Sequence, residues 1–395
     1  MARTPTVRTG LDQLCADEFA LLRGQRVGLV THAAAVDARL RSAVELFRSA
    51  PGVRLAALFG PEHGLHGTAQ DLAAVASADD PDTGLRVHSL YGETFASLSP
   101  RAEQLEGLDT LVIDLVDVGS RYYTFQATML FCLEAASRHG LRTVILDRPN
   151  PLGGAAVEGP ALAPGFESFV GLHPIVTRHG LTIGELARMY HAERGLTGEL
   201  TVIPCAGWRR EQYFDATGLP WVMPSPNMPT LDTALVYPGQ CLLEGTNLSE
   251  GRGTTRPFEL CGAPGVDPRA LVRRLDAEGL SGVVFRPAWF TPMFQKWAGQ
   301  LCGGVQLHVI DREVFRPVRT GLAVLHALRE LIGPRFAWRT EPYEFVADRP
   351  AIDLLFGSDR ERRALEQGTP AADIARAWEA EEEAFRVRRQ KFLLY

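Results

Sequence analysis

Short apolar runs recur through the first 150 residues, and stretches with helical spacing separate them. The expected strands cover residues 27–31, 53–59, 108–115 and 141–146, with a less regular one at 85–90. The helices between them are expected at 38–48 and 122–138. Uninterrupted apolar strands that alternate with helices are typical of a parallel sheet covered on both faces. The pattern therefore predicts a Rossmann-like, doubly wound α/β domain that ends with the strand at 141–146.

The pattern changes after residue 150, where Gly and Pro become frequent and only 182–193 has clear helical spacing before residue 230. The run M-P-S-P-N-M-P at 223–229 contains three prolines, which exclude regular structure. We place a domain boundary there, between a Rossmann-like domain (1–228) and a smaller α+β domain (229–395). The expected elements of the second domain are helices at 267–277, 320–332 and 371–387 and strands at 283–286 and 304–310.

Charge and composition narrow the class of protein. The net charge of −6, without a basic cluster, argues against a nucleic-acid partner, because phosphate binding needs an excess of Lys and Arg. No run of eighteen apolar residues is present, so no membrane partner is expected. Residues 1–10 lack the apolar segment of a secretory signal, which predicts a cytoplasmic protein unless the true start lies upstream. The sequence does not indicate an oligomeric state.

Several common catalytic and cofactor motifs are absent from the sequence. The six cysteines form no C-x-x-C pair, so a cysteine zinc site is not expected. There is no G-x-S-x-G elbow, no Walker A loop and no G-x-G-x-x-G after the first strand. We therefore expect neither a cofactor nor a resident metal.

Polar residues follow the expected strands, where an open parallel sheet binds its ligands. Their side chains should meet at one edge of the sheet, and the carboxylates among them suggest acid–base chemistry. Glu62 is the first candidate catalytic residue, with Asp114 or Asp117 as its partner. The other candidates at this edge are His63, His66, Arg121, Tyr122, Asp147, Arg148 and Asn150.

Structural roles compete with these assignments. Asp147 can instead cap a turn, and Asp114 and Asp117 can pair with Arg121. A functional role is favoured more strongly for Glu62. This residue lies in the glycine-flanked loop G-P-E-H-G-L-H-G, and glycines allow a backbone to approach a ligand closely.

A metal site at this loop is a further alternative. His63 and His66 have a plausible spacing for two ligands, with a third from Asp114 or Asp117. The helical motif H-E-x-x-H is absent, however, and the loop is too rich in glycine to form a helix.

The second half contains one conspicuous polar stretch, L-E-G-T-N-L-S-E-G-R-G-T-T-R-P-F-E at 243–259. Its density of glycine and charge is poorly suited to a core or a helix, and we expect a loop that faces the site. Arginines in such a loop suit a ligand that carries a carboxylate. The candidate binding residues are Glu244, Asn247, Glu250, Arg252 and Arg256 here, and Asn227 in the proline-rich run.

Five ordered motifs together resemble the NamZ-type (YbbC-like) exo-β-N-acetylmuramidases. They are G-P-E-H-G-L-H-G, D-V-G-S-R-Y-Y-T-F, D-R-P-N-P-L-G-G with V-E-G-P, M-P-S-P-N-M-P-T and C-L-L-E-G-T-N-L-S-E-G-R-G-T-T-R-P-F-E. The resemblance, which extends from about residue 10 to the C-terminus, implies a cleft between two domains. It also implies release of N-acetylmuramic acid from the non-reducing end of peptidoglycan fragments. Glu62 matches the glutamate proposed as catalytic in that family.

This resemblance leads to a mechanistic hypothesis. Glu62 is expected to act as the acid, with a second carboxylate or the acetamide of the substrate completing the reaction. An arginine among Arg121, Arg252 and Arg256 should bind the lactyl carboxylate of muramic acid, and Tyr122 or Tyr123 should stack on the sugar. The expected partner is a small amino-sugar or muropeptide substrate, recycled or imported. The alternatives are a non-catalytic muropeptide-binding protein and a metal-assisted hydrolase.

Overall fold

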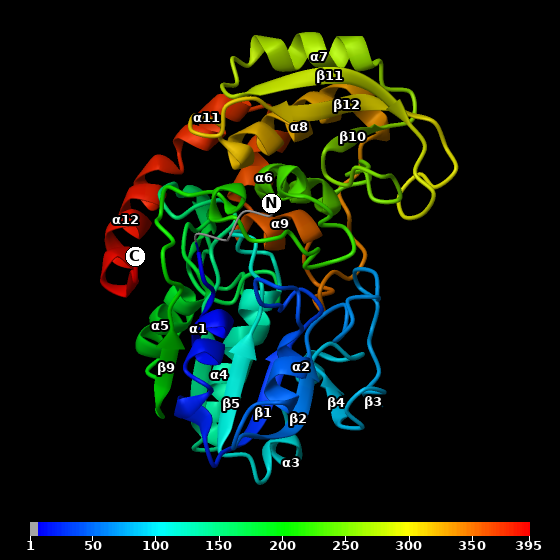
Figure 1. Ribbon diagram of the computed structural model, residues 1–395. Helices are drawn as coiled ribbons and strands as arrows, with labels where there is room; N and C mark the ends of the chain where they lie inside the picture. Colours follow the sequence, from blue (N-terminus) through cyan, green and yellow to red (C-terminus); the bar gives the residue numbers. More distant parts are fainter. Residues whose placement is uncertain (1–6) are drawn as a thin grey trace.

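A seven-stranded sheet forms the base of the molecule in the computed structural model, which describes residues 7–395 (Figure 1). Its strand order is β3-β4-β2-β1-β5-β6-β9, and every neighbouring pair is parallel except β3 and β4. The strands are β1 (Arg26–Thr31), β2 (Arg54–Gly60), β3 (Ala78–Asp79), β4 (Arg86–Ser89), β5 (Thr110–Asp114), β6 (Arg142–Leu146) and β9 (Leu200–Ile203).

Helices cover both faces of this sheet, which explains why the strands read as continuous apolar runs. In β5, Leu111 and Ile113 belong to the core beneath α4 and α5, whereas Val112 belongs to the core beneath α1 and α2. The helices are α1 (Gly10–Ala16), α2 (Ala43–Arg48), α4 (Phe125–Arg138) and α5 (Ile183–Glu193), with a short α3 (Ala102–Leu105) at the lower edge. The predicted doubly wound α/β class is therefore confirmed.

Two details of the predicted secondary structure were wrong: the edge of the sheet and the start of one helix. The sheet does not end at β6, because β9 pairs with it in parallel and extends the edge. The helix expected from residue 38 begins only at Ala43. Asp37 causes this delay, because its carboxylate accepts hydrogen bonds from the backbone N–H groups of Arg39 and Arg41 and holds these residues in a turn.

The second half contains a three-stranded antiparallel sheet in the order β10-β12-β11 (Figure 1). The strand expected at 283–286 continues to residue 290, and the helix expected at 371–387 is divided in two beside the buried Trp378. The main elements are α6 (Leu231–Gln240), β10 (Leu260–Ala263), α7 (Pro268–Ala277), β11 (Val283–Phe290), β12 (Cys302–Val309), α8 (Pro317–Ile332), α9 (Ala351–Phe356), α10 (Arg360–Glu366), α11 (Ala371–Arg376) and α12 (Glu379–Arg389).

Helices α6 and α8 cross with their backbones in contact. A Cβ atom on Gly239 would lie 1.9 Å from the carbonyl oxygen of Pro317, so no larger residue fits there. This contact fixes the end of α6 and the 3₁₀ turn that follows it, Cys241–Gly245, which carries Glu244. The packing of two helices therefore positions a candidate site residue.

The end of the chain returns to the first half. Helix α12 packs on the strand β7 (Glu158–Ala161), which pairs with β8 (Val176–Arg178). The division into 1–228 and 229–395 stays a prediction, and residues 379–395 contact the first half whichever boundary is chosen.

Within the described part of the chain, no helix has both the length and the apolar character needed to cross a membrane. The expected localisation depends on residues 1–10, of which 1–6 lie outside the described residues.

Asp147, directly after β6, anchors this returning end. Its fully buried carboxylate accepts hydrogen bonds from the hydroxyl of Tyr395 at 2.6 Å, the hydroxyl of Thr182 at 2.8 Å and the backbone N–H of Gly184 at 2.8 Å. Burial raises the pKa of Asp147 to about 6, and these three donors oppose the rise. Asp147 therefore binds the first turn of α5 and the C-terminal Tyr395, a structural role other than the turn cap considered from the sequence.

We expect Tyr395→Phe to lower the free energy of unfolding by about 1.5–3 kcal/mol at pH 8, where the ionised Asp147 loses a donor. The raised pKa means that protonation of Asp147 stabilises the fold at low pH, and that this contribution is lost as the pH rises through about 6. The loss in the variant should therefore be smaller at pH 5. Urea unfolding at both pH values measures the difference, and equal losses would contradict this role.

Candidate active site

A cavity of about 510 Å³, part of it open to solvent, lies where the carboxyl end of the large sheet meets the second half of the chain. Both halves of the chain contribute to its walls. Of the predicted site residues, Glu62, His63, Tyr122, Asn227, Glu244 and Arg252 line it. The remaining lining residues are Asp71, Leu72, Tyr123, Thr124, Val170, Ser225, Met228, Tyr237, Phe258, Tyr343 and Glu344.

Glu62 enters the cavity from the loop that follows β2. It is buried, and its Oε2 accepts a hydrogen bond of 2.6 Å from the hydroxyl of Thr124, the residue that precedes α4. The N-terminal end of a helix carries partial positive charge, which attracts a carboxylate at this position. The next residue, His63, bonds through Nδ1 to the carbonyl oxygen of Ala69 at 2.9 Å, so Nε2 of the neutral ring is left as an acceptor.

Glu344 enters the same cavity from the opposite side, on a tight turn. Tyr343 and Val346 exchange backbone hydrogen bonds of 2.9 and 3.0 Å around Glu344 and Phe345, which have φ values of 45° and 68°. Two successive left-handed residues form the kind of turn that favours Gly, Asn or Asp, so Glu and Phe are strained there. The Glu344 carboxylate accepts a hydrogen bond from the hydroxyl of Tyr91 at 3.1 Å.

The environment of Glu344 favours its neutral form. Burial, followed by the negative charge of Glu62, raises the pKa of Glu344 well above its ordinary value, although the Tyr91 hydroxyl opposes the rise. Glu244 and Asp71 act in the same direction as Glu62. Burial and the neighbouring negative charges therefore both act against ionisation of this carboxyl.

Arg252 is the one arginine in the cavity wall. Its Nη1 donates to Glu244 at 2.5 Å, and the second oxygen of Glu244 accepts from the hydroxyl of Tyr343 at 2.7 Å. Its Nε is buried without a hydrogen-bond partner, with Asp71 at 3.5 Å. Burial raises the pKa of Asp71, and Glu244 adds to the rise, whereas Arg252 opposes it.

Backbone strain is concentrated around this cavity. His63, Leu72, Phe258 and Glu344 all line it and have φ values between 45° and 71°. Non-glycine residues adopt such angles only where the surrounding structure enforces them, and they gather at functional sites. Their presence supports this cavity as the functional site.

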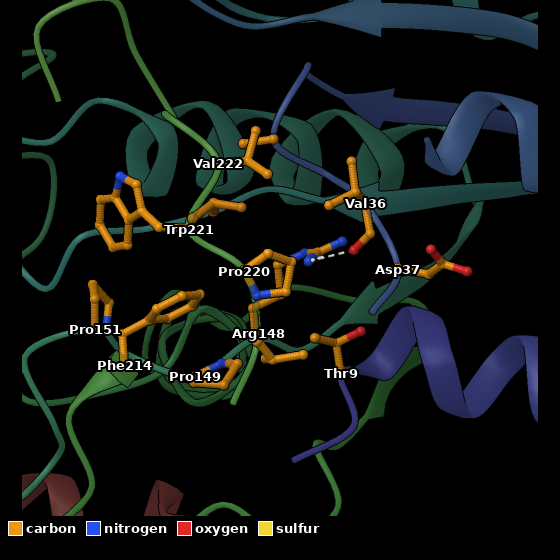
Figure 2. Close-up of a pocket in the computed structure, with 13 residues that line it drawn as sticks. Thr9, Val36, Asp37, Arg148, Pro149, Pro151, Phe214, Pro220, Trp221 and Val222 are labelled. Atoms are coloured by element: carbon orange, nitrogen blue, oxygen red, sulfur yellow. Dashed lines mark hydrogen bonds between the residues drawn. The ribbon is translucent and has the colours of Figure 1, made fainter. Parts of the chain in front are cut away.

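Asp114 lies outside the cavity, in contrast to the prediction. Its carboxylate is fully buried and bonds the Arg148 guanidinium through Nε at 2.5 Å and Nη2 at 2.8 Å. The third nitrogen of Arg148 donates to the carbonyl oxygen of Val36 at 3.1 Å (Figure 2). Figure 2 shows this arginine beside a second, mostly apolar cavity, walled by Pro149, Pro220 and Trp221 among others. Asp114 is therefore neutralised, with Arg148 rather than with Arg121.

Asp117 also lies outside the cavity wall. It accepts a hydrogen bond from the backbone N–H of Gly119 at 2.6 Å and lies 3.3 Å from Nε2 of the buried His179. The second catalytic group proposed from the sequence is therefore not beside Glu62 at either aspartate. The positions of these side chains depend on long-range partners that a strand-end rule does not include.

The side chains of Arg121 and Asn150 form hydrogen bonds to backbone groups. The buried Arg121 donates to four carbonyl oxygens, those of Pro160, Ile175, Leu355 and Phe356, at 2.7–3.0 Å. Asn150 bonds the backbone of Leu152 and Leu181. Neither side chain lines the cavity, and Arg121 joins the two halves of the chain instead.

Only part of the polar loop at 243–259 lines the cavity. Glu244 and Arg252 do, whereas Asn247, Glu250 and Arg256 are not part of its wall. Asn247 bonds the backbone of Arg335 and Ala337, and the half-exposed Arg256 pairs with Glu259 at 3.4 Å. Glu250 is buried against the ammonium of Lys296 at 2.9 Å. Burial opposes ionisation of Glu250, but the charges of Lys296 and Arg252 bring its pKa below the ordinary value.

The structure gives little support to a metal site at the Glu62 loop. His66 is exposed and lies 3.6 Å from Asp80 rather than beside His63. Among residues 7–395, no three His, Cys, Asp or Glu side chains are grouped as metal ligands.

The sequence analysis missed Asp71, Thr124 and Glu344. Asp71 follows Glu62 by nine residues in one long loop, and this continuity was a usable signal. Glu344 follows no strand and has no glycine beside it, so nothing local indicates its role.

Comparisons with known proteins agree along the whole chain. Residues 27–232 match the family model "Exo-beta-N-acetylmuramidase NamZ, N-terminal", and residues 235–395 match its C-terminal counterpart. The peptidoglycan beta-N-acetylmuramidase NamZ of Bacillus subtilis (strain 168) is 45% identical over 394 residues, which cover 100% of this chain and 92% of that protein.

Two solved structures of DUF1343 family proteins from Bacteroides fragilis NCTC 9343 are also similar. The first has a TM-score of 0.90 and 34% identity, and the match covers 100% of both chains. The second has a TM-score of 0.77 and 29% identity, over 98% of this chain and 99% of that one.

We expect Asp114→Asn to lower the free energy of unfolding by about 3–5 kcal/mol, because Arg148 then keeps a buried charge without a counterion. Asp114→Leu combined with Arg148→Met should recover most of this loss, since it removes both charges. Urea unfolding of the three proteins tests the assignment. A mild effect of Asp114→Asn, or a loss in the double variant at least as large as that of Asp114→Asn, would show that the pair is not the structural contact described above.

Proposed function

This chain belongs to the NamZ family of exo-β-N-acetylmuramidases, and on this premise we propose that Glu62 and Glu344 are its catalytic carboxyl pair. The protein is a glycoside hydrolase that releases N-acetylmuramic acid from the non-reducing end of a peptidoglycan-derived substrate. The observation that carries the proposal is the burial of Glu62 and Glu344 in one cavity, where one carboxyl raises the pKa of the other.

Hydrolysis of a glycoside usually requires an acid that protonates the leaving oxygen. It also requires a carboxylate that attacks the anomeric carbon or activates the water that does so. A pair of carboxyl groups meets both needs when its environment separates their charge states. Burial and the charge of Glu62 raise the pKa of Glu344 well above its ordinary value, so we assign the proton of the pair to Glu344. Glu62, which accepts the hydroxyl of Thr124, supplies the negative charge.

In this assignment Glu344 donates its proton to the glycosidic oxygen as the bond to the anomeric carbon breaks. Glu62 stabilises the positive charge that develops on the sugar, either directly or by orienting the acetamide of the substrate. The roles are reversed relative to the sequence-based hypothesis, in which Glu62 was the acid, and Glu344 replaces Asp114 and Asp117 as partner. Neither aspartate lines the cavity: Asp114 pairs with Arg148, and Asp117 bonds the backbone N–H of Gly119.

Arg252 is our candidate for recognition of the lactyl carboxylate that distinguishes muramic acid from glucosamine. It lines the cavity, and its buried Nε makes no hydrogen bond within residues 7–395, with the Asp71 carboxylate 3.5 Å away. An anion there would gain a charged donor without breaking the 2.5 Å contact to Glu244. The rings of Tyr122 and Tyr123 form the adjacent apolar wall on which a sugar can pack.

The carboxyl pair is tested with two β-glycosides of N-acetylmuramic acid, one with a 2,4-dinitrophenyl leaving group and one with a methyl group. We expect Glu62→Gln to lower kcat by about 10³-fold or more on both, because both need the carboxylate. Glu344→Gln should lower kcat about 10²–10⁴-fold on the methyl glycoside and far less on the dinitrophenyl glycoside, whose leaving group needs no acid.

The pH dependence supplies the control. The acid must be protonated, so activity on the methyl glycoside falls as the pH rises through the pKa of Glu344. Tyr91→Phe removes a donor that lowers this pKa, and it should move the alkaline limb to higher pH. Equal losses of Glu344→Gln on both substrates would remove Glu344 from the acid role. Near-normal turnover in Glu62→Gln would remove Glu62 from the mechanism.

Arg252→Lys tests lactyl recognition, because lysine keeps the charge beside Glu244 but loses the guanidinium Nε. We expect kcat/KM for the muramic acid glycoside to fall about 10–100-fold, the range of a hydrogen bond to a charged group. The corresponding glucosamine glycoside should be affected little. Arg256→Lys, outside the cavity wall, is the matched control. A parallel loss on both sugars would show that Arg252 supports the cavity rather than the lactyl group.

A further inference from the structure

We propose that Met293 and Phe294, in the connection between β11 and β12, form the surface that binds the first sugar on the leaving side of the scissile bond. The inference deepens the proposed function and rests on it. In Figure 1 this yellow connection extends beyond the small sheet, on the side where β3 and β4 lie in the large sheet. The established activity assigns the terminal sugar to the cavity, and the inference concerns what lies outside it.

The connection is fixed to the cavity wall on both sides of Phe294. The side-chain amide of Gln295 donates to the cavity residue Asp71 at 3.0 Å. The backbone N–H of Met293 donates at 2.8 Å to the carbonyl oxygen of Gly253, which follows Arg252 in the chain. A Cβ atom on Gly253 would lie 2.5 Å from the carbonyl oxygen of Phe294, so the two backbones are in close contact. Phe294 is thereby placed at the edge of the cavity.

Lys296 and Trp297 are partly buried and bond to the polar loop at 243–259. The ammonium of Lys296 donates to Glu250 at 2.9 Å and to two carbonyl oxygens, and the indole of Trp297 donates to the carbonyl oxygen of Asn247 at 2.6 Å. Gln295 and Trp297 have φ values of 65° and 61°, a strained backbone that these contacts enforce. The connection is therefore anchored by specific side-chain bonds, so its outward residues have defined positions.

Those outward residues are apolar. Met293 is 78% exposed and Phe294 is 42% exposed, and Trp289 and Leu301 of the same hairpin are exposed as well. Apolar side chains grouped on a surface are a common mark of a binding site. An aromatic ring and a polarisable thioether suit the C–H face of a sugar ring and the methyl group of an acetamide.

The geometry of an exo-acting enzyme identifies the occupant. The terminal sugar occupies the cavity, so the sugar joined to it through the scissile bond lies outside. Asp71 and Arg252 line the cavity, and Asp71 and Gly253 contact the connection that carries Phe294, so we place the next ring on this surface. We assign the surface to the glycan, and binding of a peptide stem is one outcome that would overturn the assignment.

The test compares two substrates of the Met293→Ala/Phe294→Ala variant. One is the disaccharide of N-acetylmuramic acid β-linked to N-acetylglucosamine, and the other is the methyl β-glycoside, which has no second ring. Release of N-acetylmuramic acid is followed by chromatography. We expect the ratio of kcat/KM values, disaccharide over methyl glycoside, to fall about five- to tenfold, mainly through KM, as expected for a lost ring contact.

Ile310→Ala is the matched control, since it also removes an exposed apolar side chain, at the other end of β12. Its ratio should equal that of the wild type. An unchanged ratio in the double variant would overturn the inference. A ratio that changes only when the glycan carries a peptide would assign the surface to the stem instead. Failure of the wild type to cleave either substrate would instead refute the proposed function.

Discussion

Burial of several carboxylates around a single arginine is the constraint on which the site depends. Like charges in a cavity with little water repel each other strongly, and protonation of one group relieves the repulsion. Burial and the charge of Glu62 both raise the pKa of Glu344. In the pair that we propose, one residue type thereby provides both an acid and a carboxylate. Arg252 and the hydroxyl of Tyr343 bind the two oxygens of Glu244.

Other carboxylates at the same edge of the sheet are compensated and hold the fold together. Asp114 forms a two-point ion pair with Arg148, and Asp147 accepts donors from α5 and from the C-terminal Tyr395. Within residues 7–395, the one hydrogen bond to the Glu62 carboxylate comes from the hydroxyl of Thr124. The distinction between a structural and a reactive acid therefore lies in how completely each charge is compensated.

The second half of the chain contributes charged side chains to the cavity as well as part of its wall. The strained turn that carries Glu344 is held by the hydroxyl of Tyr91, and the adjacent Tyr343 bonds to Glu244. These contacts offset the cost of two left-handed residues, because the turn cannot relax without breaking them. Arg121, with four backbone acceptors drawn from both halves, resists separation of the two walls.

Local features of the sequence determined five of the seven strands of the large sheet, the helices α2, α4 and α5, and the loop that presents Glu62. This was possible because hydrophobic periodicity and glycine-flanked turns depend on residues close together in the chain. The tertiary structure alone decided which acids share the cavity. Tyr91 and Glu344 are 253 residues apart, and Arg148 reaches Asp114 across neighbouring strands. A carboxylate becomes structural or reactive through its partners in space, and the charge and burial that set its proton affinity arise only when distant segments pack together.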